Sequence, residues 1–182
     1  MSWQTYLSDL MAKILYKGRW FTAEEISSKG KPFERVRIQD AVCIVPILDG
    51  GKILLEYHDR PVVGKRMYEL PAGLIEEDES PSHAARRELA EETGYAPKKL
   101  RHLVDAYMSP GILTEFAHFY LATGLLKVSR KTDADERTAT RLLGIGTVSS
   151  LIEKNKILNA HSIIGILYYL RYIAKGTFGK RP

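Results

Sequence analysis

The segment from Gly73 to Tyr95 concentrates acidic side chains in an otherwise basic chain. Its sequence, GLIEEDESPSHAARRELAEETGY, holds six glutamates and one aspartate, whereas the whole chain of 182 residues has a net charge of +5. Hard divalent cations such as Mg²⁺ take oxygen ligands, and they commonly combine a few carboxylates with the phosphate oxygens of a substrate. The segment therefore suits a divalent metal ion that also takes phosphate oxygens as ligands.

A helix should present these carboxylates. Ser80 is a capping residue and Pro81 suits the first helical position, while Gly94 is a typical helix stop. The spacing predicts a helix from Pro81 to Thr93. At about 100° per residue, three glutamates near its end share one stripe, and apolar residues lie to one side for packing. The glutamates are Glu88, Glu91 and Glu92, and the packing residues are Ala85 and Leu89.

The stripe is electrostatically unfavourable without a cation. Like charges four residues apart, as in Glu88 and Glu92, destabilise a helix by ~0.2–0.5 kcal/mol, and the negative end of the helix dipole opposes them further. For any one of these residues, an ordinary solvated glutamate remains the alternative. Together they predict a bound cation, and Arg87, four residues before Glu91, can orient that carboxylate by a charge-assisted bond.

The spacing of the segment resembles a known family motif. Gly73, five residues, Glu79, seven residues and then RELAEETGY (87–95) resemble the complete box of the Nudix hydrolases, with every fixed position filled. The resemblance implies an α/β (α+β) fold, namely an α/β/α sandwich with a mixed sheet, that binds Mg²⁺ or Mn²⁺ and hydrolyses a diphosphate linked to another moiety. It implies that Glu88, Glu91 and Glu92 are metal ligands or base, that Arg87, Glu91 and Glu92 act in catalysis, and that Gly73, Glu79, Arg87 and Gly94 hold the loops.

The flanking sequence resembles the ADP-ribose pyrophosphatase branch of that family. YELPAGLIE precedes the box and SPGILTEFAHFYLA follows it, and Pro110 stands fifteen residues past Tyr95, where that branch has its marker proline. LYKGRWF, Arg60-Pro61 and KILNAHSIIGILYYL are also similar, so the resemblance covers about residues 14 to 174. It implies cleavage of ADP-ribose, or of a related nucleoside diphosphate sugar, to AMP and ribose 5-phosphate.

The same resemblance assigns further site residues. The Ala72 carbonyl would be a metal ligand beside Glu88 and Glu92, and a catalytic acid is expected in KTDADERTAT, with Glu136 preferred over Asp133 and Asp135. The chain departs from the pattern of this branch in two places. EYHDRP is one residue longer than usual before the arginine–proline pair, and the segment after Glu136 lacks the customary apolar–acidic strand. The substrate-binding residues would be Trp20 or Phe21 on adenine, together with Arg35, Arg37, Arg60, Glu69, Ser109 and Glu115.

These substrate residues have plainer alternatives. Arg60 could be a loop cation, Glu115 a surface residue at a strand start, and Trp20 a core aromatic. In the branch that the chain resembles, the N-terminal segment up to about Ile38 crosses to a partner and helps to cover the adenosine. We therefore expect a homodimer, whereas the alternative is an N-terminal helix that packs back on its own sandwich.

Periodicity supplies the surrounding elements. Apolar residues between Trp3 and Ile14 predict a short helix, and strand-like stretches follow at 14–26 and 33–38, separated by turn residues 30–32. Asp49-Gly50-Gly51 indicates a hairpin between two apolar runs. Further strands are expected in MYELP, LRHLVDAYMS and EFAHFYLATGLL, and helices near 147–155 and 160–174. We expect an appendage over residues 1–38, which would dimerise, and a catalytic domain over 39–182.

Composition narrows the remaining possibilities. The chain has no apolar run long enough to span a bilayer and no signal-peptide pattern at its start, so we expect a cytoplasmic protein without membrane partners. A pI near 9.2 suits anionic partners, but the basic residues are dispersed, which makes nucleic acid an unlikely partner. Cys43 is expected in a buried strand. The five histidines show no zinc-ligand spacing, so no zinc site is predicted.

Other functions remain open at this point. One is a nucleotide-sensing Nudix module that does not cut, although such modules usually have a broken box. Another is an RNA-directed or RNA-cap pyrophosphatase, which the basic charge alone suggests. Flavin or nicotinamide dinucleotides also compete with ADP-ribose, and the sequence does not rank these substrates, choose Mg²⁺ over Mn²⁺ or give the number of ions.

Overall fold

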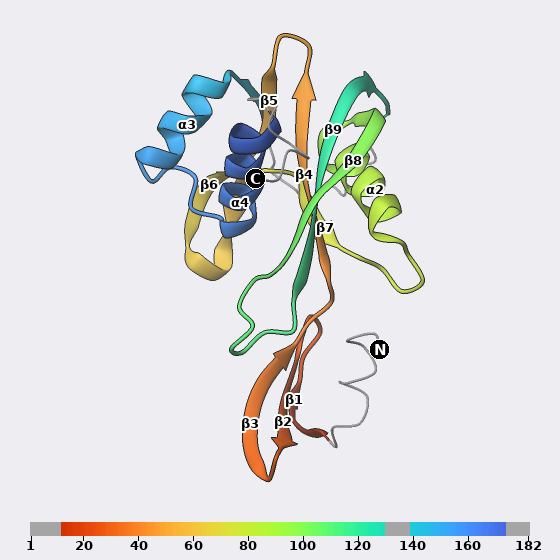
Figure 1. Cartoon of the computed structure of the whole chain (residues 1–182), viewed down its shortest axis with the longest axis vertical. Helices are drawn as coiled ribbons and strands as arrows, with labels where there is room; N and C mark the ends of the chain where they lie inside the picture. Colours follow the sequence, from red (N-terminus) through yellow and green to blue (C-terminus); the bar gives the residue numbers. More distant parts are fainter. Residues whose placement is uncertain (1–11, 130–138, 174–182) are drawn as a thin grey trace. The chain divides into compact units, whose positions relative to one another are not determined.

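The computed structural model describes residues 12–129 and 139–173, and it divides into two compact units. The first unit comprises Met1–Asp40 and Tyr107–Phe116, and the second comprises Ala41–Ala106 and Ala117–Pro182 (Figure 1). Most of the helix expected between Trp3 and Ile14 lies outside the described residues. Ile14 itself belongs to a strand, so the predicted helix does not extend that far.

The N-terminal unit contains a three-stranded antiparallel sheet in the order β1-β2-β3. The strands are β1 (Ala12–Lys17), β2 (Thr22–Ser28) and β3 (Lys31–Arg37). The strand-like stretch predicted over 14–26 is a hairpin, because the chain reverses at Gly18, whose N–H donates to the Phe21 carbonyl at 2.9 Å. The next turn occupies Lys29 and Gly30, both with positive φ, so Lys31 and Pro32 start a strand and are not turn residues as predicted.

The Tyr107–Phe116 loop belongs to this unit because it pairs with the end of β3. The Val36 N–H donates to the Ile112 carbonyl at 2.7 Å, and the Thr114 N–H donates to the Val36 carbonyl at 3.1 Å. The Thr114 hydroxyl oxygen also accepts from the Ile38 N–H at 3.1 Å. The N-terminal strands and this distant loop therefore fold as one piece.

The second unit is built on a seven-stranded mixed sheet with the path β10-β5-β4-β9-β8, in which β6 pairs with β5 and β7 with β4. β4 runs parallel to β9 and antiparallel to β5 and β7. The strand after Glu136 that the sequence did not indicate is present as β10, and β7 was also not predicted. The strands are β4 (Ala41–Leu48), β5 (Lys52–Arg60), β6 (Lys65–Glu69), β7 (Ala72–Leu74), β8 (Tyr95–Tyr107), β9 (Phe116–Lys127) and β10 (Ala139–Leu143).

Helices cover both faces of this sheet. α2 (Pro81–Thr93) lies on one side, and α3 (Ile145–Glu153) and α4 (Ala160–Tyr168) lie on the other (Figure 1). A short helix, η1 (Pro61–Val63), follows β5, and a π-helical turn, η2 (Tyr169–Ile173), extends α4. The predicted α/β/α sandwich with a mixed sheet is confirmed. Among the described helices, none combines the length and the apolar character that a membrane crossing requires.

Side chains of β4 point alternately to the two faces of the sheet, which explains why helices pack on both faces. Val42 and Ile44 are fully buried and pack with Ala84, Ala85 and Leu89 of α2. On the α4 side, Gly165 allows close packing, because a Cβ at that position would lie 2.9 Å from Leu70 and 3.2 Å from Val45. Cys43 is buried in the same strand, as predicted, and burial raises the pKa of its thiol, which makes it unreactive.

Candidate active site

The acidic helix forms where its local signals place it. α2 runs from Pro81 to Thr93, as predicted, and the Ser80 hydroxyl accepts a hydrogen bond from the His83 N–H at 3.3 Å. Gly94 ends the helix in the left-handed conformation, with φ 74°. Leu89 faces the buried core. The glutamate stripe therefore lies on a different face of the helix, where two of its carboxylates reach strand β7.

Gly73 in β7 leaves the space that the carboxylate of Glu88 occupies. A Cβ added at Gly73 would lie 2.5 Å from Glu88 Oε2 and closer still to the other carboxylate atoms. Gly73 does not have a positive φ, so this position requires glycine because of the lack of space and not because of backbone strain. Helix and strand thus meet with Glu88 directly against the β7 backbone.

Glu92 contacts the same strand at Ala72, the residue before Gly73. Its Oε2 accepts a hydrogen bond from the Ala72 N–H at 3.0 Å. Ala72 is paired with Cys43 of β4, so the central sheet holds its backbone in place. The backbone of Ala72 and Gly73 consequently lies beside two carboxylates of α2, those of Glu88 and Glu92.

Arg87 ties the helix to the preceding loop. Its guanidinium binds Glu79 in a bidentate manner, with Nε to Oε1 at 3.0 Å and Nη2 to Oε2 at 2.8 Å, and it also donates to the Leu74 carbonyl at 3.0 Å. The bond from Arg87 is the main reason why the pKa of Glu79 falls to about 2. The predicted loop-holding pair is in contact.

Arg87 also contacts two carboxylates of the stripe. Its Nη1 donates to Glu88 at 2.7 Å and to Glu91 at 3.3 Å. Burial nevertheless raises the pKa of Glu88, with further contributions from Glu91 and Glu79, because the bond from Arg87 offsets only part of the desolvation. Glu88 is therefore a partly buried acid, 14% exposed, for which a further cation would stabilise the charged form.

A second ion pair lies on the neighbouring strands. Arg60 at the end of β5 binds Glu69 of β6, with Nη2 to Oε2 at 2.7 Å, and Glu69 is buried. The hydrogen bond to Glu69 is the main reason why the pKa of Arg60 is raised, and the charges of Glu92 and Glu56 add to it. Two of the predicted substrate residues, Arg60 and Glu69, are thus brought together in the electrostatic neighbourhood of Glu92.

The sequence analysis missed two residues of this neighbourhood. Glu56 is buried and lies directly opposite Glu69 in the β5–β6 register. Asn159, the N-cap of α4, donates from Nδ2 to Glu69 at 3.3 Å and accepts from the Ser162 N–H at 2.9 Å. A glutamate that interrupts the apolar run ILLEY, and an asparagine just before a helical pattern, are the signals that could have indicated them.

The remaining predicted substrate residues belong to the N-terminal unit. Trp20 and Phe21 are exposed, with 63% and 41% of their surfaces accessible, so Trp20 is not the core aromatic that its alternative required. Arg35 and Arg37 both bind the buried Glu24, at 2.9 and 2.7 Å. The other two residues are in the Tyr107–Phe116 loop, namely Ser109 and Glu115.

Comparison with known proteins decides the family. Residues 37–149 match the NUDIX domain. The chain belongs to the Nudix family. It is 33% identical over 144 residues to an ADP-ribose pyrophosphatase of Bacillus subtilis (strain 168), with 78% of each chain covered. It is 30% identical over 176 residues to the ADP compounds hydrolase NudE of Escherichia coli (strain K12), with 92% of each covered. A crystal structure of an ADP compounds hydrolase superposes with a TM-score of 0.79 at 23% identity, over 92% of this chain and 95% of that one.

The Nudix family implies a divalent cation, and the residues of this Nudix domain fit one. Glu88, Glu92 and the Ala72 backbone offer oxygen donors, which Mg²⁺ and Mn²⁺ prefer. Gly73 leaves no side chain between them, and the raised pKa of Glu88 indicates that the site favours an additional positive charge. The predicted late-loop acids, Glu136 with its alternatives Asp133 and Asp135, lie outside the described residues.

Two histidines of this Nudix chain lie close together although their spacing along the sequence did not indicate it. His102 and His118, sixteen residues apart in the sequence, both reach Asp105. The ligand atoms of these three residues are close enough to hold a metal ion. Among residues 12–129 and 139–173, this is the one such group of three histidine, cysteine or acidic side chains. Sequence spacing missed it because the two histidines come from different strands.

Proposed function

We propose that this Nudix protein is a metal-dependent pyrophosphatase that hydrolyses ADP-ribose to AMP and ribose 5-phosphate, or cleaves a related nucleoside diphosphate sugar. The main supporting observation is the placement of Glu88 and Glu92 against the backbone of Ala72 and Gly73, with room for no side chain at Gly73. The names of the relatives, an ADP-ribose pyrophosphatase and an ADP compounds hydrolase, support the substrate class.

Each residue would have a distinct task. A bound Mg²⁺ or Mn²⁺ would screen the pyrophosphate charge and lower the pKa of the attacking water. Glu88, Glu92 and the Ala72 carbonyl would hold that ion, and Arg87 orients Glu88 and Glu91 through contacts of 2.7 and 3.3 Å. Glu91, whose side chain is 44% exposed, and the late-loop Glu136 are the two candidates for the base that takes the proton of the attacking water.

The Arg60–Glu69 pair would position the substrate. Glu69 holds the guanidinium by two nitrogens, and the Arg60 side chain is still 44% exposed. A planar guanidinium fixed in this way can share its remaining donors with a phosphate or a ribose hydroxyl. We therefore assign Arg60 to substrate contact and Glu69 to its orientation.

A substrate panel tests the proposed function. Purified protein is incubated with ADP-ribose, other nucleoside diphosphate sugars, dinucleotides and capped RNA, with Mg²⁺ or Mn²⁺, and the products are treated with phosphatase to release inorganic phosphate. We expect turnover of ADP-ribose that yields AMP and ribose 5-phosphate, and loss of turnover in Glu92→Gln. Binding without cleavage in both metals would instead indicate a sensing module, and turnover of capped RNA alone would contradict the substrate assignment.

We further propose that the protein is a homodimer that uses the N-terminal unit as an interface. Its short sheet exposes large apolar side chains, and sheets of this size are marginally stable without a further apolar contact. More than 40% of the surface of each of these residues is accessible: Ile14, Leu15, Tyr16, Trp20, Phe21 and Phe33. A second copy of the chain would cover them.

The dimer is best tested by point substitutions in the full chain. Deleting the residues before Gln39 would also remove β3, the pairing partner of the Tyr107–Phe116 loop, so a deletion would change more than the interface. We expect Ile14→Ser combined with Phe33→Ser to give monomers in light scattering. Val62→Ser, at a side chain that is 99% exposed in the second unit, is the matched control. A double variant that stays dimeric would contradict this interface.

A further inference from the structure

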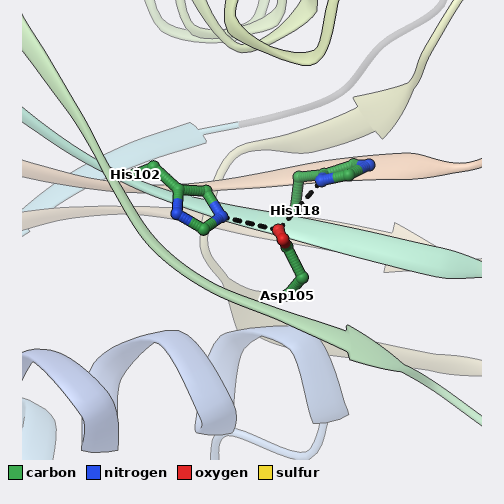
Figure 2. Close-up of side chains that lie close together, drawn as sticks. All are labelled: His102, Asp105 and His118. Atoms are coloured by element: carbon green, nitrogen blue, oxygen red, sulfur yellow. Dashed lines mark hydrogen bonds and ion pairs between the residues drawn. The ribbon is translucent and has the colours of Figure 1, made fainter.

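Three polar side chains converge on the β8 and β9 strands, outside the candidate active site. His102 and Asp105 belong to β8 and His118 to β9. His102 Nε2 lies 2.6 Å from Asp105 Oδ1, and His118 Nδ1 lies 2.9 Å from the same oxygen. Figure 2 shows both imidazole rings directed at this one carboxylate.

The convergence is set by the sheet. β8 and β9 are neighbouring strands, so their backbones fix where the three side chains start. The His102 ring makes an edge contact with Tyr120, with ring centroids 5.5 Å apart, and the His118 side chain is only 17% exposed. Two of the three groups are therefore restrained by packing before any ligand arrives, which reduces the entropy lost on binding.

The donor set has the character of a transition-metal site. Two imidazole nitrogens and one carboxylate oxygen are ligands typical of Zn²⁺, and three protein ligands leave a fourth position for water. All three ligand atoms lie within 4.8 Å of one another. We propose that His102, Asp105 and His118 form a binding site for Zn²⁺, separate from the carboxylate site on α2.

Only small movements are required for such an ion to bind. With metal–ligand bonds of about 2.0–2.1 Å, tetrahedral ligand atoms lie roughly 3.3 Å apart. The separation between each nitrogen and Oδ1 must therefore grow by less than about 1 Å, and the Asp105 side chain, which is 35% exposed, has space to make this movement. The ion then replaces the two hydrogen bonds to Asp105 with three coordinate bonds.

The chemistry of the two sites differs enough to separate them. The α2 site offers oxygen donors alone, which suit Mg²⁺, whereas imidazole nitrogens favour Zn²⁺ and its transition-metal neighbours. Hydrogen bonds between two histidines and an aspartate, without any ion, are the competing explanation of the same geometry. The two explanations predict different responses of the imidazole nitrogens to zinc.

Nitrogen-15 spectra of histidine-labelled protein test the proposal directly. Zn²⁺ is titrated in the presence of excess Mg²⁺, which occupies the oxygen-donor site. Of the five histidines, we expect His102 to shift at Nε2 and His118 at Nδ1, with the other rings unchanged. If neither ring shifts, or if only other rings shift, the proposal is wrong and the cluster is hydrogen-bonded only.

Substitutions provide an independent readout by calorimetry. We expect His118→Asn and Asp105→Asn each to lower the Zn²⁺ affinity by about 100-fold or more, since even loss of an outer partner of a ligand costs about 10–100-fold. His58→Asn, a histidine on β5 outside this cluster, is the matched control and should keep wild-type affinity. Equal zinc affinity in all these proteins would overturn the proposal, and circular dichroism checks that each variant is folded.

Discussion

Substitution of Gly73 by alanine should separate catalytic damage from structural damage. The added Cβ would lie 2.5 Å from Glu88 Oε2, well inside the ~3.5–4.0 Å of a normal non-bonded contact. The β7 backbone is held between sheet and helix, whereas the overlapping atoms are the end of a flexible side chain. The Glu88 carboxylate will therefore move away while the backbone stays.

The effect on stability should be small. Displacing Glu88 breaks its 2.7 Å bond to Arg87, which as a bond between charged groups contributes about 1.5–3 kcal/mol at most. Release of a carboxylate whose pKa is raised by burial offsets part of this loss. Alanine at a position without positive φ also restricts the unfolded chain, which contributes ~0.4–1 kcal/mol of stability. We expect the free energy of unfolding to fall by about 0–2 kcal/mol.

The effect on catalysis should be large, because Glu88 leaves the place where it faces the β7 backbone. Loss of a metal ligand should lower kcat/KM by about 100-fold or more, equivalent to about 2.7 kcal/mol of transition-state stabilisation. The assay is kcat/KM for ADP-ribose across a Mg²⁺ series, beside urea denaturation in chelator. Gly146→Ala, in helix α3 with no atom within 4 Å of its added Cβ, is the control and should keep full activity. If Gly73→Ala keeps wild-type kcat/KM and metal dependence, the proposed role of Glu88 is refuted.

Three further predictions concern the metal ion, Glu92 and the Glu24 ion pairs. Chelation should abolish turnover, and Mg²⁺ should raise the melting temperature by binding only the folded state; a chelated protein with full activity would contradict the metal site. Glu92→Gln should lower the rate by roughly 100-fold, about 2.7 kcal/mol, with folding intact, and wild-type turnover would remove Glu92 from the mechanism. The pKa of the buried Glu24 is lowered because bonds from Arg37 and Arg35 outweigh its desolvation. As the pH falls, Glu24 therefore becomes protonated in the unfolded state before it does so in the folded state. The stabilisation by the ion pairs is complete above the unfolded pKa of about 4.3 and is lost as the pH falls from there through the folded pKa. In urea titrations between pH 3 and 7, the stability difference between wild type and Glu24→Gln should shrink towards acid, and a constant difference would contradict the ion pair.

Local signals were sufficient for the acidic helix and its neighbours. The limits of α2 follow from Ser80, Pro81 and Gly94, each of which acts on the backbone within a few residues. The hairpin at Asp49-Gly50-Gly51 and the fold class were predictable for the same reason, since turn residues and apolar periodicity express themselves over short distances. The resemblance of the box to the Nudix motif then named the residues from Gly73 to Gly94.

Other features could be seen only in the folded chain. The overlap between Gly73 and Glu88 depends on how closely α2 approaches β7, and the Arg60–Glu69 pair with Glu56 opposite depends on the register of β5 and β6. β10, which the sequence did not indicate, exists because β5 offers it a pairing edge. Packing and pairing between distant segments decide these contacts, and intrinsic strand preference is too dependent on context to predict them.

The histidine cluster shows the same division most clearly. The residue types of His102, Asp105 and His118 are fixed by the sequence, but their spacing of three and thirteen residues matches no local metal-ligand pattern. They meet because β8 and β9 lie side by side in the sheet. The sequence by itself thus determined the acidic helix, its caps and the box chemistry, whereas the tertiary structure alone decided which distant side chains share a site, because strand register depends on the packing of the entire sheet.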